Sequence, residues 1–305
     1  MPVDIAIGAP KDRTREFAYT RDDFDKVRKL IHAHAGIRLN DTKQEMVYSR
    51  LARRLRALHL DSFSSYITLL ENSEDPEWEH FVNALTTNQT AFFREAHHFP
   101  VLADYLRGLR AGARATLWSA AASTGEEAYS MAITACDAFG TLAPPVKILA
   151  TDLDSRVLAQ ASEGIYALEQ LKDLAPDRLR RFFFRGTGSK AGLARVKPEL
   201  RALVSFGRHN LREESWRLGE SFDCIFCRNV MIYFDKPTQR QVLTRMARVL
   251  KPEGLLFAGH SESYFHASDL FRLCGRTVYC HAGGGNAPFA GPAWSGRSVS
   301  DADGG

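Results

Sequence analysis

Three carboxylates stand where they could bind a ligand. Glu126 and Glu127 follow directly on Gly125, and Asp152 comes at the end of the next apolar run. A pyrophosphate-binding turn needs several glycines, as in GxGxxG or GxxxxGKS/T, whereas Gly125 stands alone and no lysine follows it. Neighbouring carboxylates repel a phosphate but complement a ligand that carries an ammonium group and a sulfonium. The alternative for either glutamate is that it only favours the helix dipole.

The residues around these glutamates predict a strand, a tight turn and the start of a helix. The apolar run Ala115 to Ala122 is typical of a buried strand, and it breaks at Ser123 to Gly125 before a helical pattern begins. In an α/β domain, a nucleotide-like ligand binds in the crevice outside the carboxyl end of the first strand, where small residues let it approach the backbone. Ala120 to Ser123 are small, and S-adenosylmethionine is a ligand with the charges described above.

Asp152 ends the segment that we predict to be the second strand, Val146 to Ala150. An acidic residue at this place accepts hydrogen bonds from ribose hydroxyls in nucleotide-binding α/β domains. The alternative is that Asp152 caps the helix that starts at Ser155, although Asp154 is the better candidate for that cap.

The segments that follow predict an α/β domain with an open, mostly parallel sheet. Strand-like runs at Leu203 to Phe206, Phe222 to Cys227 and Leu255 to Ala258 are separated by helical patterns such as Lys236 to Leu250. The segment from 182 to 206 is instead split by glycines, which predicts a small antiparallel excursion. Its exposed strand edge could dock a peptide by strand addition, or the excursion could be a lid or a segment that only fills space.

A small helical domain is predicted before this sheet. Its second helix, from Thr42 to Leu60 after a predicted cap at Asp41, carries an arginine face formed by Arg50, Arg53 and Arg56. We interpret this face as a docking surface for an acidic protein, because Tyr48 is its sole aromatic residue and nucleic-acid surfaces interleave several. The alternative is a solvated face that binds nothing.

Composition excludes several classes of protein. The 305 residues carry a net charge of +4, with 45% hydrophobic and 25% charged residues, which is typical of a globular protein and too weakly basic to indicate nucleic-acid binding. No apolar run approaches the roughly 20 residues of a membrane span. The first residues lack the pattern of a signal peptide, so we expect a cytoplasmic protein without membrane insertion. Cys224 and Cys227 read as core-strand residues, and we expect no metal site.

Five motifs, in order, carry a resemblance to a known family: TNQTAFFRE, WSAAASTGEEAYS, ATDLDS, RNVMIYFD and LLFAGHSE. Over residues 20–281 the chain resembles the CheR family of chemotaxis receptor methyltransferases, which are protein-glutamate O-methyltransferases that use S-adenosylmethionine. The resemblance implies a Rossmann-like class I methyltransferase fold with a small antiparallel β-subdomain, preceded by an all-α domain. The expected parts are a flexible lead (1–20), a helical receptor-docking domain (21–85), a linker (86–95), a methyltransferase domain (96–282, with the β-subdomain at about 182–202) and a disordered tail (283–305).

The resemblance also assigns roles to residues. The cofactor-binding residues that it implies are Asn88, Thr90, Arg94, Glu127, Asp152, Asn210, Leu211, Arg228 and Asn229. Arg94 and Tyr233 are the polar groups expected nearest the transferred methyl, and Arg50, Arg53 and Arg56 would meet the acidic methylation helices of the receptors' cytoplasmic domain. Some receptors end in a short peptide that docks on the β-subdomain, and the sequence does not settle whether this chain uses one. The implied enzyme is cytoplasmic, recruited to receptor clusters, and serves sensory adaptation.

The expected reaction needs little proton chemistry. A receptor glutamate is already ionised near neutral pH, so it can attack the sulfonium methyl without a general base. Arg94 would hold that carboxylate, Glu127 the methionine ammonium, Asp152 the ribose and Asn210 the adenine. Three alternatives remain open: a nicotinamide dehydrogenase, which the lone Gly125 disfavours, a non-catalytic adaptor with this fold, and a methyltransferase for small molecules.

Overall fold

The chain divides into two compact units in the computed structural model, which describes residues 15–71, 76–86 and 89–283. One unit comprises Met1–His34 and Arg38–Thr86, and the other comprises Ala35–Ile37 and Thr87–Gly305. Most of the predicted lead, Asn88 of the linker and nearly all of the predicted tail lie outside the described residues. No helix within the described ranges is both long and apolar enough to cross a membrane.

The first unit is helical, as predicted. Its elements are α1 (Arg21–Ala35), η1 (Asp41–Lys43), α2 (Gln44–Ala57), α3 (Phe63–Glu71) and α4 (Glu77–Leu85). Its core consists of the apolar stripes of these helices, including Phe24, Val47, Leu51, Phe63 and Phe81, all fully buried. The predicted cap at Asp41 is wrong: Asp41 lies inside η1, and its carboxylate accepts hydrogen bonds from Arg21 (2.6 Å) and Arg28 (3.0 Å).

The end of the predicted flexible lead packs on α2. Tyr19 is buried, and its ring lies 4.4 Å from that of Phe63 between centroids. Arg15 forms an ion pair with Glu45 and places its guanidinium 5.0 Å from the ring centroid of Tyr48. These contacts stabilise residues 15–20 on the helical unit, so the predicted lead from 1 to 20 extends too far.

The second unit is built on a mostly parallel sheet with the strand order β6-β2-β1-β7-β8-β10-β9. The bounds are β1 (Ala115–Ser119), β2 (Val146–Asp152), β6 (Val204–Arg208), β7 (Phe222–Cys227), β8 (Leu250–Ala258), β9 (Phe271–Gly275) and β10 (Val278–His281). β6, β2, β1, β7 and β8 pair in parallel, and β10 pairs antiparallel with β8 and β9, so β9 and β10 form a hairpin at this end of the sheet.

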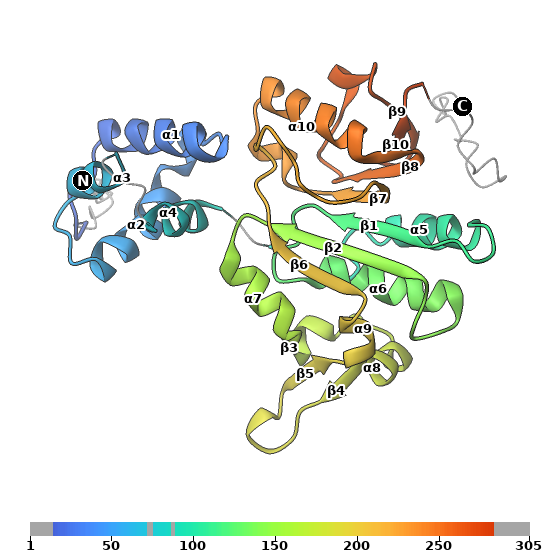
Figure 1. Cartoon of the computed structure of the whole chain (residues 1–305). Helices are drawn as coiled ribbons and strands as arrows, with labels where there is room; N and C mark the ends of the chain where they lie inside the picture. The colour runs from blue at the N-terminus through green and yellow to red at the C-terminus, as the bar shows by residue number, and fades with distance from the viewer. Residues whose placement is uncertain (1–14, 72–75, 87–88, 284–305) are drawn as a thin grey trace, which may run out of the picture. The chain divides into compact units, whose positions relative to one another are not determined.

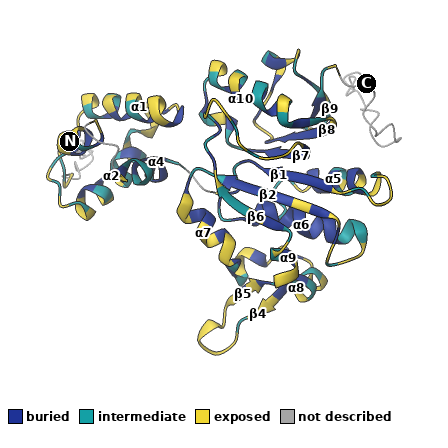
Figure 2. Cartoon of the chain, viewed as in Figure 1, coloured by how far each residue is buried: buried dark blue, intermediate teal, exposed yellow. Residues whose placement is uncertain are grey.

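Helices cover both faces of this sheet (Figure 1). The helices of this unit are α5 (His98–Arg107), α6 (Glu126–Phe139), α7 (Ser155–Glu163), α8 (Pro176–Phe182), α9 (Pro198–Arg201) and α10 (Lys236–Val249). α5 and α6 pack on one face with Leu117 and Phe226, and α10 packs on the other with Trp118 and Ile225. β1 and the first three turns of α6 are buried throughout, as the dark blue ribbon of Figure 2 shows.

The connections of the sheet diverge between β1 and β7. After β1 the chain turns through α6 to β2 and then to β6 on one side, whereas β7, β8 and the hairpin lie on the other side. Open α/β sheets bind ligands outside the carboxyl ends of the strands at such a switch point. The residues that follow β1 and β7 are therefore the first place to look for a site.

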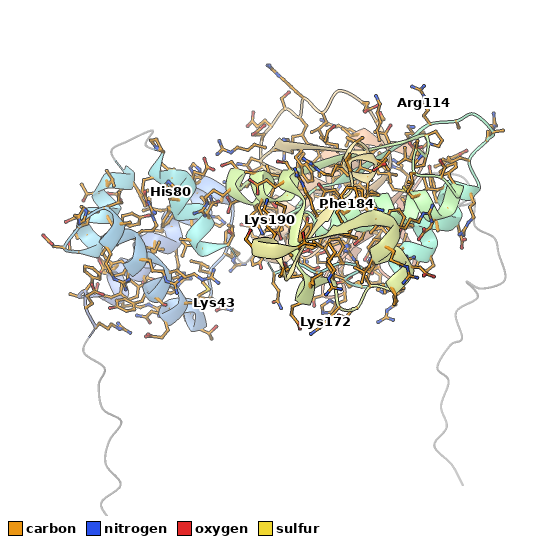
Figure 3. All side chains as sticks on the ribbon, turned by 90° about the horizontal axis from the view of Figure 1, so that it is seen from below. Lys43, His80, Arg114, Lys172, Phe184 and Lys190 are labelled. Atoms are coloured by element: carbon orange, nitrogen blue, oxygen red, sulfur yellow. The ribbon has the colours of Figure 1, made fainter. Side chains whose placement is uncertain are left out.

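A second, antiparallel sheet has the order β3-β5-β4. Its strands are β3 (Ile165–Ala167), β4 (Phe183–Arg185) and β5 (Leu193–Val196). The expected β-subdomain of about 182–202 therefore contains two of these strands but leaves out β3. Phe184 is exposed on β4, and Figure 3 labels its side chain.

Candidate functional site

The turn after β1 is held by backbone geometry that requires glycine. Gly125 has a φ of +96°, and its N–H donates to Ala122 O at 2.9 Å. A Cβ at this position would lie 2.8 Å from Cβ of Ala161 and 2.9 Å from the hydroxyl of Tyr166. A larger residue would push α6 away from α7 and β3, so Gly125 fixes where the first turn of α6 begins.

The two glutamates of that first turn have different partners. Glu127 is 8% exposed; its Oε1 accepts from Ser119 Oγ at 2.6 Å and its Oε2 from Arg228 Nε at 2.6 Å. Glu126 is also buried, and its carboxylate accepts from Thr124 Oγ1 at 2.7 Å and Gln170 Nε2 at 3.3 Å. Burial raises the pKa of Glu126 above its ordinary value. Glu127 thus joins the carboxyl ends of β1 and β7, whereas Glu126 joins the turn to the segment after β3.

Arg228 is the centre of a buried polar network. Besides its bond to Glu127, its Nη1 donates to Arg94 O at 2.6 Å and lies 3.1 Å from His98 Nδ1. The side chain is 2% exposed, so its charge is balanced inside the protein rather than by water. The structure therefore brings together three predicted site residues, Arg94, Glu127 and Arg228, from the linker, α6 and the end of β7.

Asp152 links the second strand to the turn after the first. Its Oδ2 accepts from Ser123 N at 2.8 Å and its Oδ1 from Asp154 N at 3.0 Å. Burial raises the pKa of Asp152 despite these bonds. The preference for Asp154 as the cap of α7 is confirmed, because its side chain accepts from Arg156 N at 2.9 Å. Asp152 is free of that capping role and lies at the carboxyl edge beside the β1 turn.

The other predicted site residues lie on loops at the same edge. Asn210 and buried Leu211 follow β6, and Asn210 Oδ1 accepts from Arg212 N at 2.9 Å. Asn229 follows Arg228 in the left-handed region with φ +59°. Tyr233 is half-buried in η4 (Met231–Tyr233).

The linker carries Thr90 and Arg94 into this unit. Arg94 is half-buried, and its Nη1 donates to Gln89 O at 2.7 Å. Phe93 N donates to Ser130 Oγ at 2.9 Å, which ties the linker to α6. Asn88, the remaining predicted residue of this segment, lies outside the described residues.

Three polar residues of the site were not predicted. Glu95 Oε1 accepts from His260 N at 3.1 Å and from Asn229 Nδ2 at 3.3 Å. Burial alone would raise the pKa of Glu95, but the bonds from His260 and the charge of Arg228 outweigh it and lower that pKa. Buried Glu262 accepts from Asn229 N at 3.0 Å and Met231 N at 2.8 Å, which fixes the turn that carries Tyr233. The third is His98. Glu95 and Glu262 stand within the quoted motifs, but their bonds join segments far apart in the sequence.

A metal ion has one candidate cluster among the residues that the structure describes. One ligand atom from each of Glu95, His97 and His98 lies within 4.8 Å of the others. However, Arg228 Nη1 lies 3.1 Å from His98 Nδ1, so the lone pair that a metal would need already faces a permanent cation. We assign no metal to this cluster.

The arginine face of α2 belongs to the first unit, and its members differ. Arg50 donates to Ala84 O at 3.2 Å and Thr86 O at 2.7 Å, so it holds the end of α4 and is less available to a partner than predicted. Arg53 is exposed, and Arg56, also exposed, bonds Glu16 at 3.0 Å. Arg54, on the same helix, forms a bidentate pair with buried Glu77 at 2.6 and 2.8 Å.

The chemistry of the edge suits a ligand with positive and hydroxyl groups. Glu127 and Asp152 each present a carboxylate that keeps lone pairs beyond the bonds described, because a carboxylate has about four acceptor positions. Such acceptors match an ammonium group and a ribose, and they disfavour a phosphate. The groups present therefore fit S-adenosylmethionine.

Comparison with known proteins agrees with this assignment. Residues 88–280 match the family model described as "CheR methyltransferase, SAM binding domain", and residues 22–86 match "CheR methyltransferase, all-alpha domain". The chain is 54% identical to "Chemotaxis protein methyltransferase 2" of Pseudomonas aeruginosa over 90% of this chain and 98% of that one. It is 52% identical to "Chemotaxis protein methyltransferase" of Salmonella typhimurium, over 87% of this chain and 92% of the relative. The chain therefore belongs to the CheR family, and it is a chemotaxis methyltransferase that uses S-adenosylmethionine.

Proposed function

We propose that this methyltransferase modifies glutamate side chains in the cytoplasmic domain of chemotaxis receptors, giving glutamate methyl esters and S-adenosylhomocysteine. The observation that carries this proposal is the state of Arg94. Within the described residues its guanidinium has no carboxylate partner, and its bond to Gln89 O uses one of five N–H donors. A half-buried arginine beside the cofactor-binding edge is suited to hold an incoming carboxylate by charge-assisted hydrogen bonds.

The remaining site residues divide the binding of the cofactor. S-Adenosylmethionine supplies an electrophilic methyl group on a sulfonium when it is bound. Glu127, held by Ser119 and Arg228, would accept from the amino group, and Asp152 from the ribose hydroxyls. The loops that carry Thr90, Asn210, Leu211 and Asn229, together with Asn88, would complete the enclosure.

Catalysis by this chain would come from positioning. Because the receptor glutamate is ionised at neutral pH, no side chain has to remove a proton. Arg94 would orient the carboxylate, and Tyr233, on the turn that Glu262 fixes, would line its path. Enclosure of the carboxylate removes water that would otherwise stabilise it.

Recognition of the receptor is proposed for two surfaces. The exposed arginines of α2, Arg53 and Arg56 with a contribution from Arg50, would attract an acidic methylation helix. Among the described strands, β4 pairs only with β5, so β4 is an edge strand of this sheet. Phe184 on β4 is 55% exposed. A receptor C-terminal peptide could add to this edge as a further strand. Removal of glutamate charges by esterification would serve sensory adaptation, with the enzyme recruited to receptor clusters.

The test is methyl transfer. The protein is incubated with labelled S-adenosylmethionine and membranes that contain chemoreceptors. The label that base releases from the membranes is then measured, because carboxyl methyl esters are base-labile and methylated amines are not. Base-labile label on a receptor-sized band is expected. Cofactor binding without transfer to several receptors would contradict the proposal and favour a non-catalytic adaptor.

A further inference from the structure

His98 is a buried histidine for which the proposed reaction has no use. It lies at the start of α5 with no exposed surface. Its Nδ1 lies 3.1 Å from Arg228 Nη1, and its Nε2 lies 2.9 Å from Thr277 Oγ1. The histidine thus joins the turn between β9 and β10 to the guanidinium that holds Glu127.

These contacts fix the protonation of the ring. A guanidinium only donates, so Nδ1 of His98 must carry a lone pair, and the ring proton must be on Nε2, where it donates to Thr277. Burial, followed by the charges of Arg228 and His97, lowers the pKa of His98 to about 3, which agrees with a neutral ring.

The neutral ring completes the coordination of the arginine. Nη1 of Arg228 has two N–H groups, and its two acceptors are Arg94 O at 2.6 Å and His98 Nδ1 at 3.1 Å. Nε donates to Glu127 at 2.6 Å. Because the guanidinium is planar, acceptors on Nε and Nη1 together fix the plane in which Arg228 presents its charge to Glu127.

We propose that His98 is a positioning residue which, as a neutral hydrogen-bond acceptor, orients Arg228 and through it the Glu127 carboxylate for the amino-acid end of the cofactor. This inference rests on the proposed role of Glu127 as the acceptor for the cofactor's amino group. Without the acceptor at position 98, one N–H of a buried guanidinium lacks a partner, and the arginine would turn toward other oxygens, such as those of Glu95 at 4.0 Å.

The experiment measures binding of two ligands by calorimetric titration of the full chain. S-Adenosylhomocysteine has the amino-acid end, whereas 5′-methylthioadenosine lacks it. For His98→Leu we expect the affinity for S-adenosylhomocysteine to fall on the order of tenfold, and the affinity for 5′-methylthioadenosine to change by less than about twofold. His98→Asn, whose Oδ1 can take the place of Nδ1, should keep the wild-type affinity for both ligands. His97→Leu is the matched control, because it removes a neighbouring histidine whose described side-chain contact is to Thr277 and not to Arg228. His97→Leu should also bind both ligands like the wild type.

Two results with the wild type and His98→Leu would overturn the inference, and each has a different meaning. If the wild type binds both ligands equally, the amino-acid end is not recognised and the proposed role of Glu127 fails with it. If the wild type prefers S-adenosylhomocysteine but His98→Leu keeps that preference, His98 does not position Arg228. Should His98→Leu not fold, His98→Gln replaces it, because a glutamine amide reaches the Nε2 position and leaves Nδ1 vacant; equal affinity of His98→Gln and His98→Asn for S-adenosylhomocysteine would then refute the inference.

Discussion

Two groups of charge, one in each unit, show how differently the same residue types can be used. The pair between Arg56 on α2 and Glu16 is 55% and 54% exposed. The side chains of Arg228 and Glu127 are only 2% and 9% exposed. This pair shares further bonds with Ser119, Arg94 and His98. Water screens the first pair and leaves it weak, whereas the second is strong only as a complete network.

The two regions are suited to different tasks. A buried, fully bonded network holds one geometry and can preorganise a ligand site. An exposed arginine face holds no geometry but keeps its charge available over a distance of about 10 Å, which suits the capture of an acidic partner. Variants in the two regions should therefore differ in both the size and the kind of their effects.

The largest effect is expected for Arg228→Met. Removal of one partner from a buried ion pair leaves the Glu127 charge uncompensated and should lower the free energy of unfolding by about 3–5 kcal/mol. The measurement is urea denaturation. The double variant Arg228→Met with Glu127→Leu should recover most of that stability without recovering cofactor binding. A single-variant loss below about 1 kcal/mol would show that the pair is not effectively buried.

Arg94→Ala should separate activity from stability. Its side chain has one described hydrogen bond, to Gln89 O, so the free energy of unfolding should change by about 1 kcal/mol or less. Methyl transfer should fall on the order of a hundredfold or more, because the receptor carboxylate would lose its orienting group. Arg94→Lys keeps the charge but not the planar fork and should recover only part of the rate. Near-normal turnover of Arg94→Ala refutes the role.

His98 should give the stability a pH dependence that its variant lacks. Since the folded pKa of His98 lies at about 3 and the unfolded one near the ordinary histidine value of 6.5, the unfolded chain binds a proton at intermediate pH that the folded chain does not. The free energy of unfolding should therefore fall with falling pH, by up to about 1.4 kcal/mol per pH unit from this group. Between roughly pH 6 and pH 4, the free energy of unfolding of His98→Asn, measured by denaturation at each pH, should depend on pH less steeply by that amount. Parallel curves for both proteins would show that His98 is protonated in the fold.

Arg56→Gln should have the smallest effect. Because its pair with Glu16 is exposed, loss of the pair should change the free energy of unfolding by less than about 1 kcal/mol, and salt should reduce even that change. Arg54→Gln is the contrast on the same helix, since Glu77 is buried and would lose a bidentate partner. If Arg54→Gln and Arg56→Gln lower the free energy of unfolding equally, burial does not determine the strength of these two ion pairs.

The pattern of the sequence predicts the elements well and their polar partners poorly. α6 begins at Glu126 as expected, because a lone glycine followed by a helical repeat is a strong local signal. β3 was missed because three residues give no recognisable alternation. Arg50 was assigned to the partner surface, since periodicity places it on a polar face but cannot show that the end of α4 lies within its reach.

The site shows the same limit. Glu127 and Arg228 were each predicted to contact the cofactor, but the bond between them joins residues 101 positions apart. His98 lies at a helix start where a histidine is unremarkable from sequence alone. Its role depends on β7, α6 and the β9–β10 turn meeting in one place, which only the packed sheet determines.

Steady-state methyl transfer with both substrates varied tests the central claim most directly, namely that the buried network holds the cofactor and the arginine face captures the receptor. Arg53→Glu should raise the receptor KM severalfold and leave the cofactor KM unchanged. Glu127→Gln should raise the cofactor KM and leave the receptor KM unchanged, because a neutral amide accepts a weaker hydrogen bond from the ammonium group than the carboxylate does. If Arg53→Glu leaves the receptor KM at the wild-type value, or if Glu127→Gln leaves the cofactor KM there, the division of labour between the two regions is wrong.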